Sequence, residues 1–146
     1  MGIFDFIKDI GKKVGIGNEA EAIEKDITKK LHDQVDDLKV AFDDGTVTLH
    51  GTVSGQPVRE KVVLLAGNVR GVEKVDDQLD IRVPPPEDAP EPTFYTVQKG
   101  DSLSKIAKSH YGDAMKWKAL FEANREVIED PDLIYPGQRI RLPEDV

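Results

Sequence analysis

A proline-rich run near the middle of the chain sets the strongest limit on how this sequence can fold. Residues 84–92 read PPPEDAPEP, so five of nine positions are proline and three are acidic. Proline fixes φ and lacks a backbone N–H, so such a run forms an extended, semi-rigid spacer rather than a helix or a sheet. The whole chain has 146 residues, which is enough for two small domains. We therefore expect one domain over residues 18–84, a linker over residues 85–92 and a second domain over residues 93–146.

Two motifs mark the ends of the second domain. Residues 95–107 read YTVQKGDSLSKIA, and residues 134–143 read IYPGQRIRLP. Together they resemble the LysM family, whose members have a βααβ fold and bind N-acetylglucosamine polymers such as peptidoglycan. The resemblance covers residues 93–143 and implies the fold, but not the ligand, because one fold supports several functions.

The same resemblance implies a shallow groove for acetylated sugars between two loops of the second domain. Its residues would be Gly100, Asp101, Ser102 and Leu103 on one side, and Pro131, Ile134 and Tyr135 on the other. A purely structural role for the first loop is also open, because Asp101 or Ser102 can cap a helix and Gly100 permits a tight turn.

Hydrophobic periodicity predicts the elements of the first domain. A helix begins near Asn18 and continues to Leu31, and a second helix follows from about residue 58 to residue 67. Strands are predicted over residues 38–42, 47–53 and 72–83, with a tight turn at residues 43–45. The last strand is expected to point Val75, Leu79, Ile81 and Val83 inward. The order helix, strand, strand, helix, strand (αββαβ) predicts helices on one face of a small sheet, and the whole chain is of the α+β class.

A second resemblance falls on this first domain. Residues 67–78 read GNVRGVEKVDDQ, and residues 51–53 read GTV after the middle strand. Both are similar to the pattern of the BON domain family, and the resemblance covers roughly residues 18–84.

The first 17 residues are predicted to form a short amphipathic helix. Apolar residues recur at helical spacing from Ile3 to Val14, and glycines at positions 11, 15 and 17 would end the helix. Asp5, Lys8 and Asp9 interrupt what would be the apolar core of a secretion signal, so we expect a cytoplasmic protein. Association of residues 3–14 with a membrane surface remains an alternative.

Composition argues against several classes of function. The formal net charge of −8 disfavours binding to nucleic acid, and no run approaches the length of a membrane-spanning helix. The chain has no cysteine, its three histidines are isolated, and its paired aspartates are adjacent rather than convergent. These features lack the spacing needed for metal-ligand clusters or for acid–base pairs. We therefore expect a protein that is not an enzyme, carries no organic cofactor and is a monomer.

The combination of a short apolar N-terminal segment, a BON domain, a proline-rich linker and a LysM domain resembles the Kbp family of bacterial potassium-binding proteins. This resemblance implies binding of K⁺, for which Rb⁺ or Cs⁺ could substitute. It further implies that the BON domain is the main binding element and that a LysM domain in contact with it stabilises the bound form.

Backbone carbonyls are the groups expected to hold such an ion. Neutral carbonyl oxygens replace the hydration shell of K⁺ well, whereas carboxylate-rich sites favour divalent ions. The last carbonyls of a helix lack partners, and two predicted helices end at Gly11 and near Gly67. The candidate oxygens are those of Ile7, Ile10, Lys12, Gly67, Val69 and Val72. Without the resemblance, both glycines are explained as ordinary helix ends.

Three functional hypotheses follow from the sequence. The first is a cytoplasmic K⁺ sensor or buffer that becomes more compact when the ion bridges the N-terminal segment and the BON domain. The second is an adaptor of the cell envelope that binds peptidoglycan through the LysM domain. The third is a membrane-associated BON protein anchored by residues 3–14.

Overall fold

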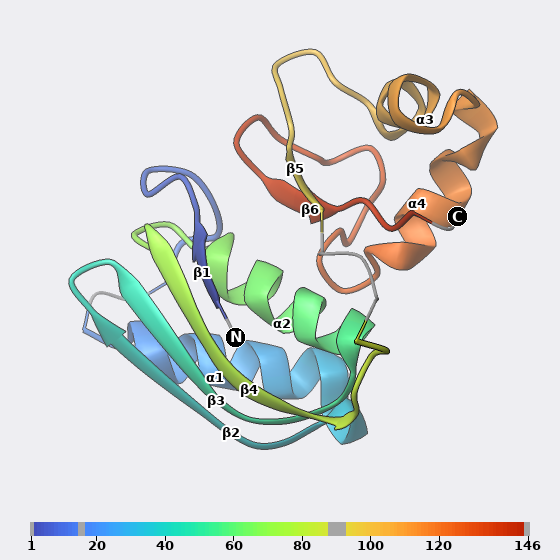
Figure 1. The fold of residues 1–146 in the computed structure, drawn as a ribbon. Helices are drawn as coiled ribbons and strands as arrows, with labels where there is room; N and C mark the ends of the chain where they lie inside the picture. Colours follow the sequence, from blue (N-terminus) through green and yellow to red (C-terminus); the bar gives the residue numbers. More distant parts are fainter. Residues whose placement is uncertain (1, 15–16, 88–92, 145–146) are drawn as a thin grey trace.

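The computed structural model describes residues 2–14, 17–87 and 93–144, which form two small domains in contact with each other (Figure 1). Helices and strands occur in both domains, as expected for the α+β class. Residues 88–92, which make up most of the expected linker, lie outside the described residues.

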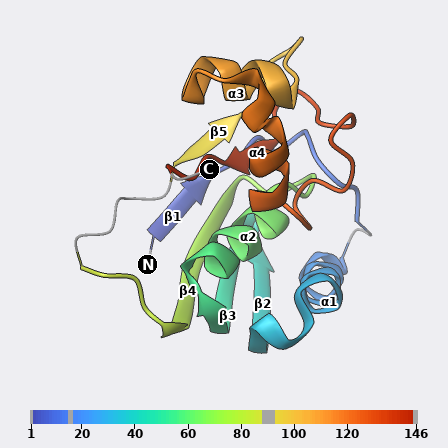
Figure 2. The same cartoon turned by 90° about the vertical axis from the view of Figure 1, so that its right-hand side faces the viewer.

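The first domain is a sheet covered on one face by two helices (Figures 1 and 2). Among the described residues, the strand order is β1-β4-β3-β2. Strands β3 and β4 are parallel, because α2 crosses over between them, and the other neighbours are antiparallel. The elements are β1 (Gly2–Asp5), α1 (Glu19–Leu31), a 3₁₀ turn (His32–Gln34), β2 (Val35–Asp43), β3 (Thr46–Gly55), α2 (Gln56–Gly67) and β4 (Lys74–Val83).

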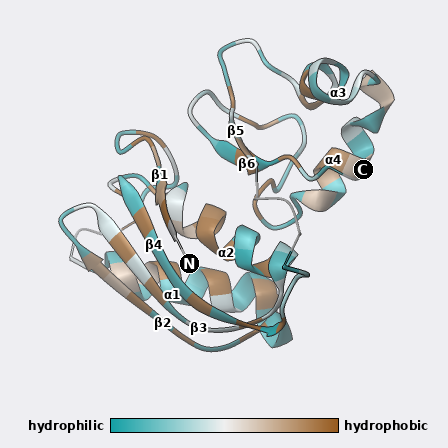
Figure 3. Cartoon of the chain, in the orientation of Figure 1, coloured by the Kyte–Doolittle hydropathy of each residue, from teal (hydrophilic) through white to brown (hydrophobic). Residues whose placement is uncertain are grey.

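The predicted apolar stripes form the core of this domain. Ile27 and Leu31 on α1, and Val47 and Leu49 on β3, are each 0% exposed. Figure 3 shows the matching alternation of hydrophobic and hydrophilic residues along the strands. Full burial of one such side chain contributes about 1.5–3 kcal/mol to stability. The inward placement of Val83 was wrong, since it is 71% exposed at the last position of β4.

The N-terminal helix predicted for residues 1–17 is also wrong over residues 2–14, which the structure describes. Residues Gly2–Asp5 form strand β1, which pairs with β4 in the register Phe4↔Val75 and Asp5↔Lys74. A helix this short is marginal in water, whereas the edge of β4 offers backbone partners for an extended chain. Ile3 is exposed and Phe4 packs against the core, as expected for a strand at the sheet edge. The membrane hypothesis thereby loses the amphipathic helix on which it rested.

The chain beyond β1 crosses the end of α2 instead of forming a helix. The N–H of Lys12 donates to the carbonyl of Asn68 (2.9 Å), and the carbonyl of Lys12 accepts from Arg70 (2.8 Å). Gly11 makes this approach possible, with φ of +123° and no side chain facing the carbonyl of Asn68.

The second domain has the expected βααβ order. Its elements are β5 (Phe94–Thr96), α3 (Leu103–Tyr111), a 3₁₀ turn (Ala114–Lys116), α4 (Trp117–Ala123) and β6 (Arg139–Arg141), with β5 and β6 antiparallel. Its buried core includes Ile106, Leu120 and Ile140. No helix in the described part of the chain is long and apolar enough to cross a membrane.

Candidate functional site

The structure brings the two predicted carbonyl segments side by side. Ile7, Ile10 and Lys12 lie on the loop after β1, Gly67 is the last residue of α2, and Val69 and Val72 lie in the turn that follows. Four backbone hydrogen bonds join the segments, two at Lys12 and the others from Gly71 N to Lys8 O (2.7 Å) and from Phe6 N to Glu73 O (2.8 Å).

The loop takes hydrogen-bond donors away from the end of α2. In a continuing helix, the N–H groups of Arg70 and Gly71 would serve the carbonyls of Ala66 and Gly67. Here they donate instead to Lys12 and Lys8. The carbonyl end of α2, which carries partial negative charge from the helix dipole, is therefore left without these two donors.

The six candidate oxygens differ in how they are engaged. The carbonyls of Lys12, Ile7 and Val69 each accept one hydrogen bond, from Arg70 (2.8 Å), Ile10 (3.3 Å) and Val72 (3.1 Å) respectively. Within the described residues, no backbone N–H donates to the carbonyls of Ile10 or Val72. A carbonyl oxygen has two lone pairs, so even the engaged oxygens keep acceptor capacity.

Charged side chains do not provide a metal site here. No group of three or more histidine or carboxylate residues that could hold a metal occurs in residues 2–14, 17–87 and 93–144. The ammonium group of Lys12 forms an ion pair with Asp26 (2.9 Å), which partly balances its charge. The six candidate oxygens of these segments are all neutral backbone carbonyls.

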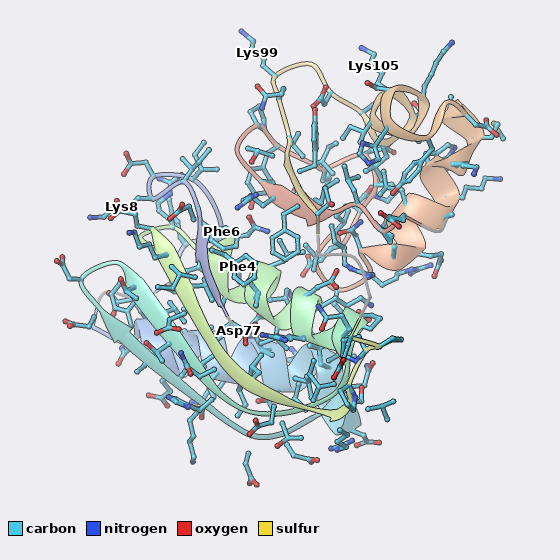
Figure 4. All side chains as sticks on the ribbon, in the orientation of Figure 1. Phe4, Phe6, Lys8, Asp77, Lys99 and Lys105 are labelled. Carbon is cyan, nitrogen blue, oxygen red and sulfur yellow. The ribbon has the colours of Figure 1, made fainter. Side chains whose placement is uncertain are left out.

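Packing fixes the relation of the loop to α2. Phe6 is 8% exposed, and its ring lies so close to Gly67 that a Cβ there would be 2.1 Å from the ring. Figure 4 shows Phe6 and Phe4 between the sheet and the second domain. Phe4 in turn contacts Phe94 at the start of β5, with ring centroids 5.2 Å apart.

Polar contacts between the domains were not predicted from the sequence. The guanidinium of Arg141 donates to Glu60 on α2 (2.9 Å), and both side chains are about one-tenth exposed. Lys61 pairs with Glu126 (2.8 Å). Charged residues on a helix or strand usually face solvent, so no local pattern indicates that these side chains would be buried or partly buried between the domains.

Asn68 makes a two-bond polar link between the domains. Its side-chain amide donates to the carbonyl of Arg139 (2.7 Å) and accepts from the N–H of Arg139 (2.9 Å). A cavity of about 430 Å³ lies beside this link, lined by Gly11, Lys12 and Asn68 on one side and by Leu133 and Tyr135 on the other.

A second buried charge lies beneath the sheet edge. Asp77 on β4 is 1% exposed and accepts hydrogen bonds from Arg59 Nε (2.5 Å) and from the N–H of Leu79 (3.0 Å). Figure 4 shows its position beside β1 and α2. Its neighbour Asp76 is only partly buried, as the expected alternation of adjacent strand residues requires.

The first loop of the predicted glycan groove, Gly100 to Leu103, forms hydrogen bonds within its own domain. Asp101 accepts from the hydroxyl of Tyr95 (2.6 Å) and from the N–H of Gln98 (2.8 Å). Ser102 caps α3 by accepting from the N–H of Lys105, and Leu103 is buried in the domain core. Gly100 is exposed with φ of +88°.

The residues on the other side of this groove are partly buried. They are Pro131, Ile134 and Tyr135. Burial raises the pKa of Tyr135, which also lines the cavity between the domains. The capping role of the first loop is observed, and use of the groove by a glycan stays a prediction.

The bond to Asp101 predicts a pH dependence of the second domain. The hydrogen bond to this carboxylate raises the pKa of Tyr95 to about 12 from its ordinary value of 10.0. The folded state thus holds the phenol proton of Tyr95 more tightly than the unfolded state does. The hydrogen bond to Asp101 therefore stabilises the fold fully below pH 10, and this stabilisation is lost as the pH rises toward 12. We expect the free energy of unfolding, measured in urea, to fall between pH 10 and pH 12 in the wild type and to fall less in Tyr95→Phe. An equal fall with pH in both proteins would contradict the role given to the Tyr95–Asp101 bond.

Comparisons with known proteins agree with both domain resemblances. The model of the LysM domain family matches residues 95–143, and the model of the BON domain family matches residues 19–83. Over 153 aligned residues, the chain is 36% identical to the potassium binding protein Kbp of Escherichia coli O6:H1, covering 99% of this chain and 100% of that protein. The chain belongs to the Kbp family. This Kbp relationship extends over both domains and the N-terminal segment.

Two other relatives align with a smaller share of this chain. An uncharacterized protein of Deinococcus radiodurans is 39% identical over 106 residues, which cover 67% of this chain and 41% of that protein. The esterase Rv1288 of Mycobacterium tuberculosis is 43% identical over 56 residues, covering 38% of this chain and 12% of the esterase. The similarity to the esterase thus covers only a small part of the esterase's length. The Escherichia coli relative, which aligns over its full length, carries a name that describes binding.

Proposed function

We propose that this protein binds K⁺ between its N-terminal segment and its BON domain. The observation that carries the proposal is the diversion of the Arg70 and Gly71 N–H groups to the N-terminal loop, beside the carbonyl end of α2. Family membership supports the choice of ion, since the full-length relative is named for binding potassium.

The chemistry of the two segments suits a monovalent cation of low charge density. The oxygens would come from Ile7, Ile10, Lys12, Gly67, Val69 and Val72, all of them backbone carbonyls. Neutral carbonyl oxygens can replace the weakly held hydration shell of K⁺. They lack the strong negative field of carboxylates, which favours divalent ions. Rb⁺ and Cs⁺, with the same charge and larger radii, would substitute for it.

Ion binding would favour a compact form of the protein. An ion held by both segments stabilises the docked state by RT ln(1 + [K⁺]/Kd), about 2.7 kcal/mol at one hundred times Kd. Phe6 on the docked loop and Phe4 on β1 both contact the second domain, so the LysM domain would stabilise the same state. We infer a non-enzymatic, monomeric sensor or buffer of cytoplasmic K⁺. Lys12, which supplies one of the candidate oxygens, also lines the cavity between the domains.

Titration with KCl and with NaCl at matched ionic strength tests the proposal. We expect the thermal midpoint to rise and the radius of gyration to fall with K⁺ but not with Na⁺. Equal responses to the two salts would indicate general screening of the net charge and would contradict a specific site.

A further inference from the structure

We infer that Asn68 and Arg139 are positioning residues that couple the LysM domain to the ion site. This inference rests on the proposed function and explains how a domain that supplies none of the candidate carbonyls can act on them. It follows from a closed set of contacts among the N-terminal loop, the end of α2 and strand β6.

The main chain of Asn68 is held within the candidate site. Its neighbours Gly67 and Val69 both supply candidate oxygens, its N–H donates to Leu64 at the end of α2 (2.9 Å), and its carbonyl accepts from Lys12 (2.9 Å). Displacement of this residue therefore moves the carbonyls on either side of it.

The side chain of Asn68 forms its hydrogen bonds with the second domain. Through its two bonds to the backbone of Arg139, the amide takes the place that a neighbouring strand would occupy beside β6. Both bonds are partly buried, which makes the loss of either partner costly.

The side chain of Arg139 returns from β6 to the N-terminal segment. Its Nη1 donates to the carbonyl of Asp5 (2.7 Å), and its guanidinium lies 5.6 Å from the ring centroids of both Phe6 and Phe94. Burial lowers the pKa of Arg139. These contacts form a closed cycle. Gly67 packs against Phe6, Phe6 lies against Arg139, and Arg139 is bonded to Asn68, which follows Gly67 in the chain.

This cycle has a physical consequence for ion binding. Carbonyls replace a hydration shell only when they are held near one another before the ion arrives, and ordering them at the moment of binding costs affinity. Two of the three segments in the cycle carry candidate oxygens, and the third, β6, holds the other two in place.

Two variants test the coupling. In full-length protein, Asn68→Ala removes both amide bonds, and Arg139→Met removes the bond to Asp5 and the contacts with both rings. We expect each to raise the Kd for K⁺ by roughly tenfold, and the double variant by much less than one hundredfold, because the two residues act in one linkage. Lys61→Met is the matched control, since it removes another contact between α2 and the second domain without touching the N-terminal loop; it should change the Kd less than about twofold.

Amide hydrogen exchange separates positioning from a general loss of stability. We expect the N–H groups of Arg70 and Gly71 to exchange faster in Asn68→Ala and Arg139→Met than in the wild type, in Na⁺ buffer without K⁺, and to be unchanged in Lys61→Met. A Kd within twofold of the wild type for both variants, or an equal loss in the control, would overturn the coupling. If the wild type shows no preference for K⁺, the proposed function fails, and the exchange rates still decide whether the linkage exists.

Discussion

Gly11→Ala should abolish the K⁺-dependent compaction and detach the N-terminal loop from α2. A Cβ at this position would lie 2.4 Å from the carbonyl oxygen of Asn68 and 3.1 Å from the nitrogen of Arg70. These are backbone atoms that cannot move aside without breaking the bonds between the segments. The backbone strain of a side chain at positive φ adds about 1–2 kcal/mol, and overpacking adds about 1–3 kcal/mol. Together these give a loss of docking free energy of about 2–5 kcal/mol, which corresponds to a rise in Kd of roughly thirtyfold or more.

Gly112→Ala is the matched control for this prediction. Gly112 ends α3 in the second domain and also has a positive φ, +80°, but a Cβ there has no atom within 4 Å. We expect it to show only the backbone cost, about 1–2 kcal/mol, and to retain a K⁺ response. Calorimetric titration and small-angle scattering in KCl would compare the two variants. The model of a docked loop is wrong if Gly11→Ala binds K⁺ as tightly as Gly112→Ala.

Arg141→Met should destabilise the contact between the domains by about 3–5 kcal/mol, because it leaves the buried carboxylate of Glu60 without its cationic partner. Glu60 would keep one weaker contact, with the amide of Gln56 (3.1 Å). Arg141 also donates to the carbonyl of Ala123 (2.8 Å), so the end of α4 loses a partner in the same variant. The single tryptophan of the chain, Trp117 on α4, reports unfolding of this domain by fluorescence in urea.

Two further variants isolate the charge effect. Glu60→Gln combined with Arg141→Met removes the unpaired charge, and we expect it to recover a substantial part of the lost stability. Arg125→Met removes an exposed pair with Glu122 in the same domain, and it should cost less than about 1 kcal/mol. If the double variant is no more stable than Arg141→Met alone, burial of an unpaired carboxylate is not the cause.

The N-terminal segment shows why periodicity can mislead over a short stretch. Apolar residues at positions 3, 4, 6, 7 and 10 fit a helix, and the same residues serve a strand followed by a loop. The choice depended on β4, whose free edge lies more than sixty positions away along the chain. Phe6 was expected on a helix face and instead fills the space above Gly67, a contact that no local pattern encodes.

The candidate ion site was predictable in part. Glycines at positions 11 and 67 indicated where carbonyls would be free, and the structure brings both positions together. The reason given for Gly11 was wrong, because it does not end a helix but allows the loop to approach Asn68. Asn68 itself was passed over, since an asparagine after a helix is commonly a simple cap and nothing nearby in sequence points to its partner on β6.

The sequence by itself determined the α+β class, the two domain families and the order of elements from α1 to β6. Each of these depends on local spacing, turn residues and motifs that occupy a few consecutive positions. Only the tertiary structure decided that residues 2–5 form a strand, that Glu60 and Arg141 are buried together, and that Asn68 joins the two domains. Those features arise where segments distant in sequence compete for the same backbone partners and the same buried space, and the outcome depends on all of the segments at once.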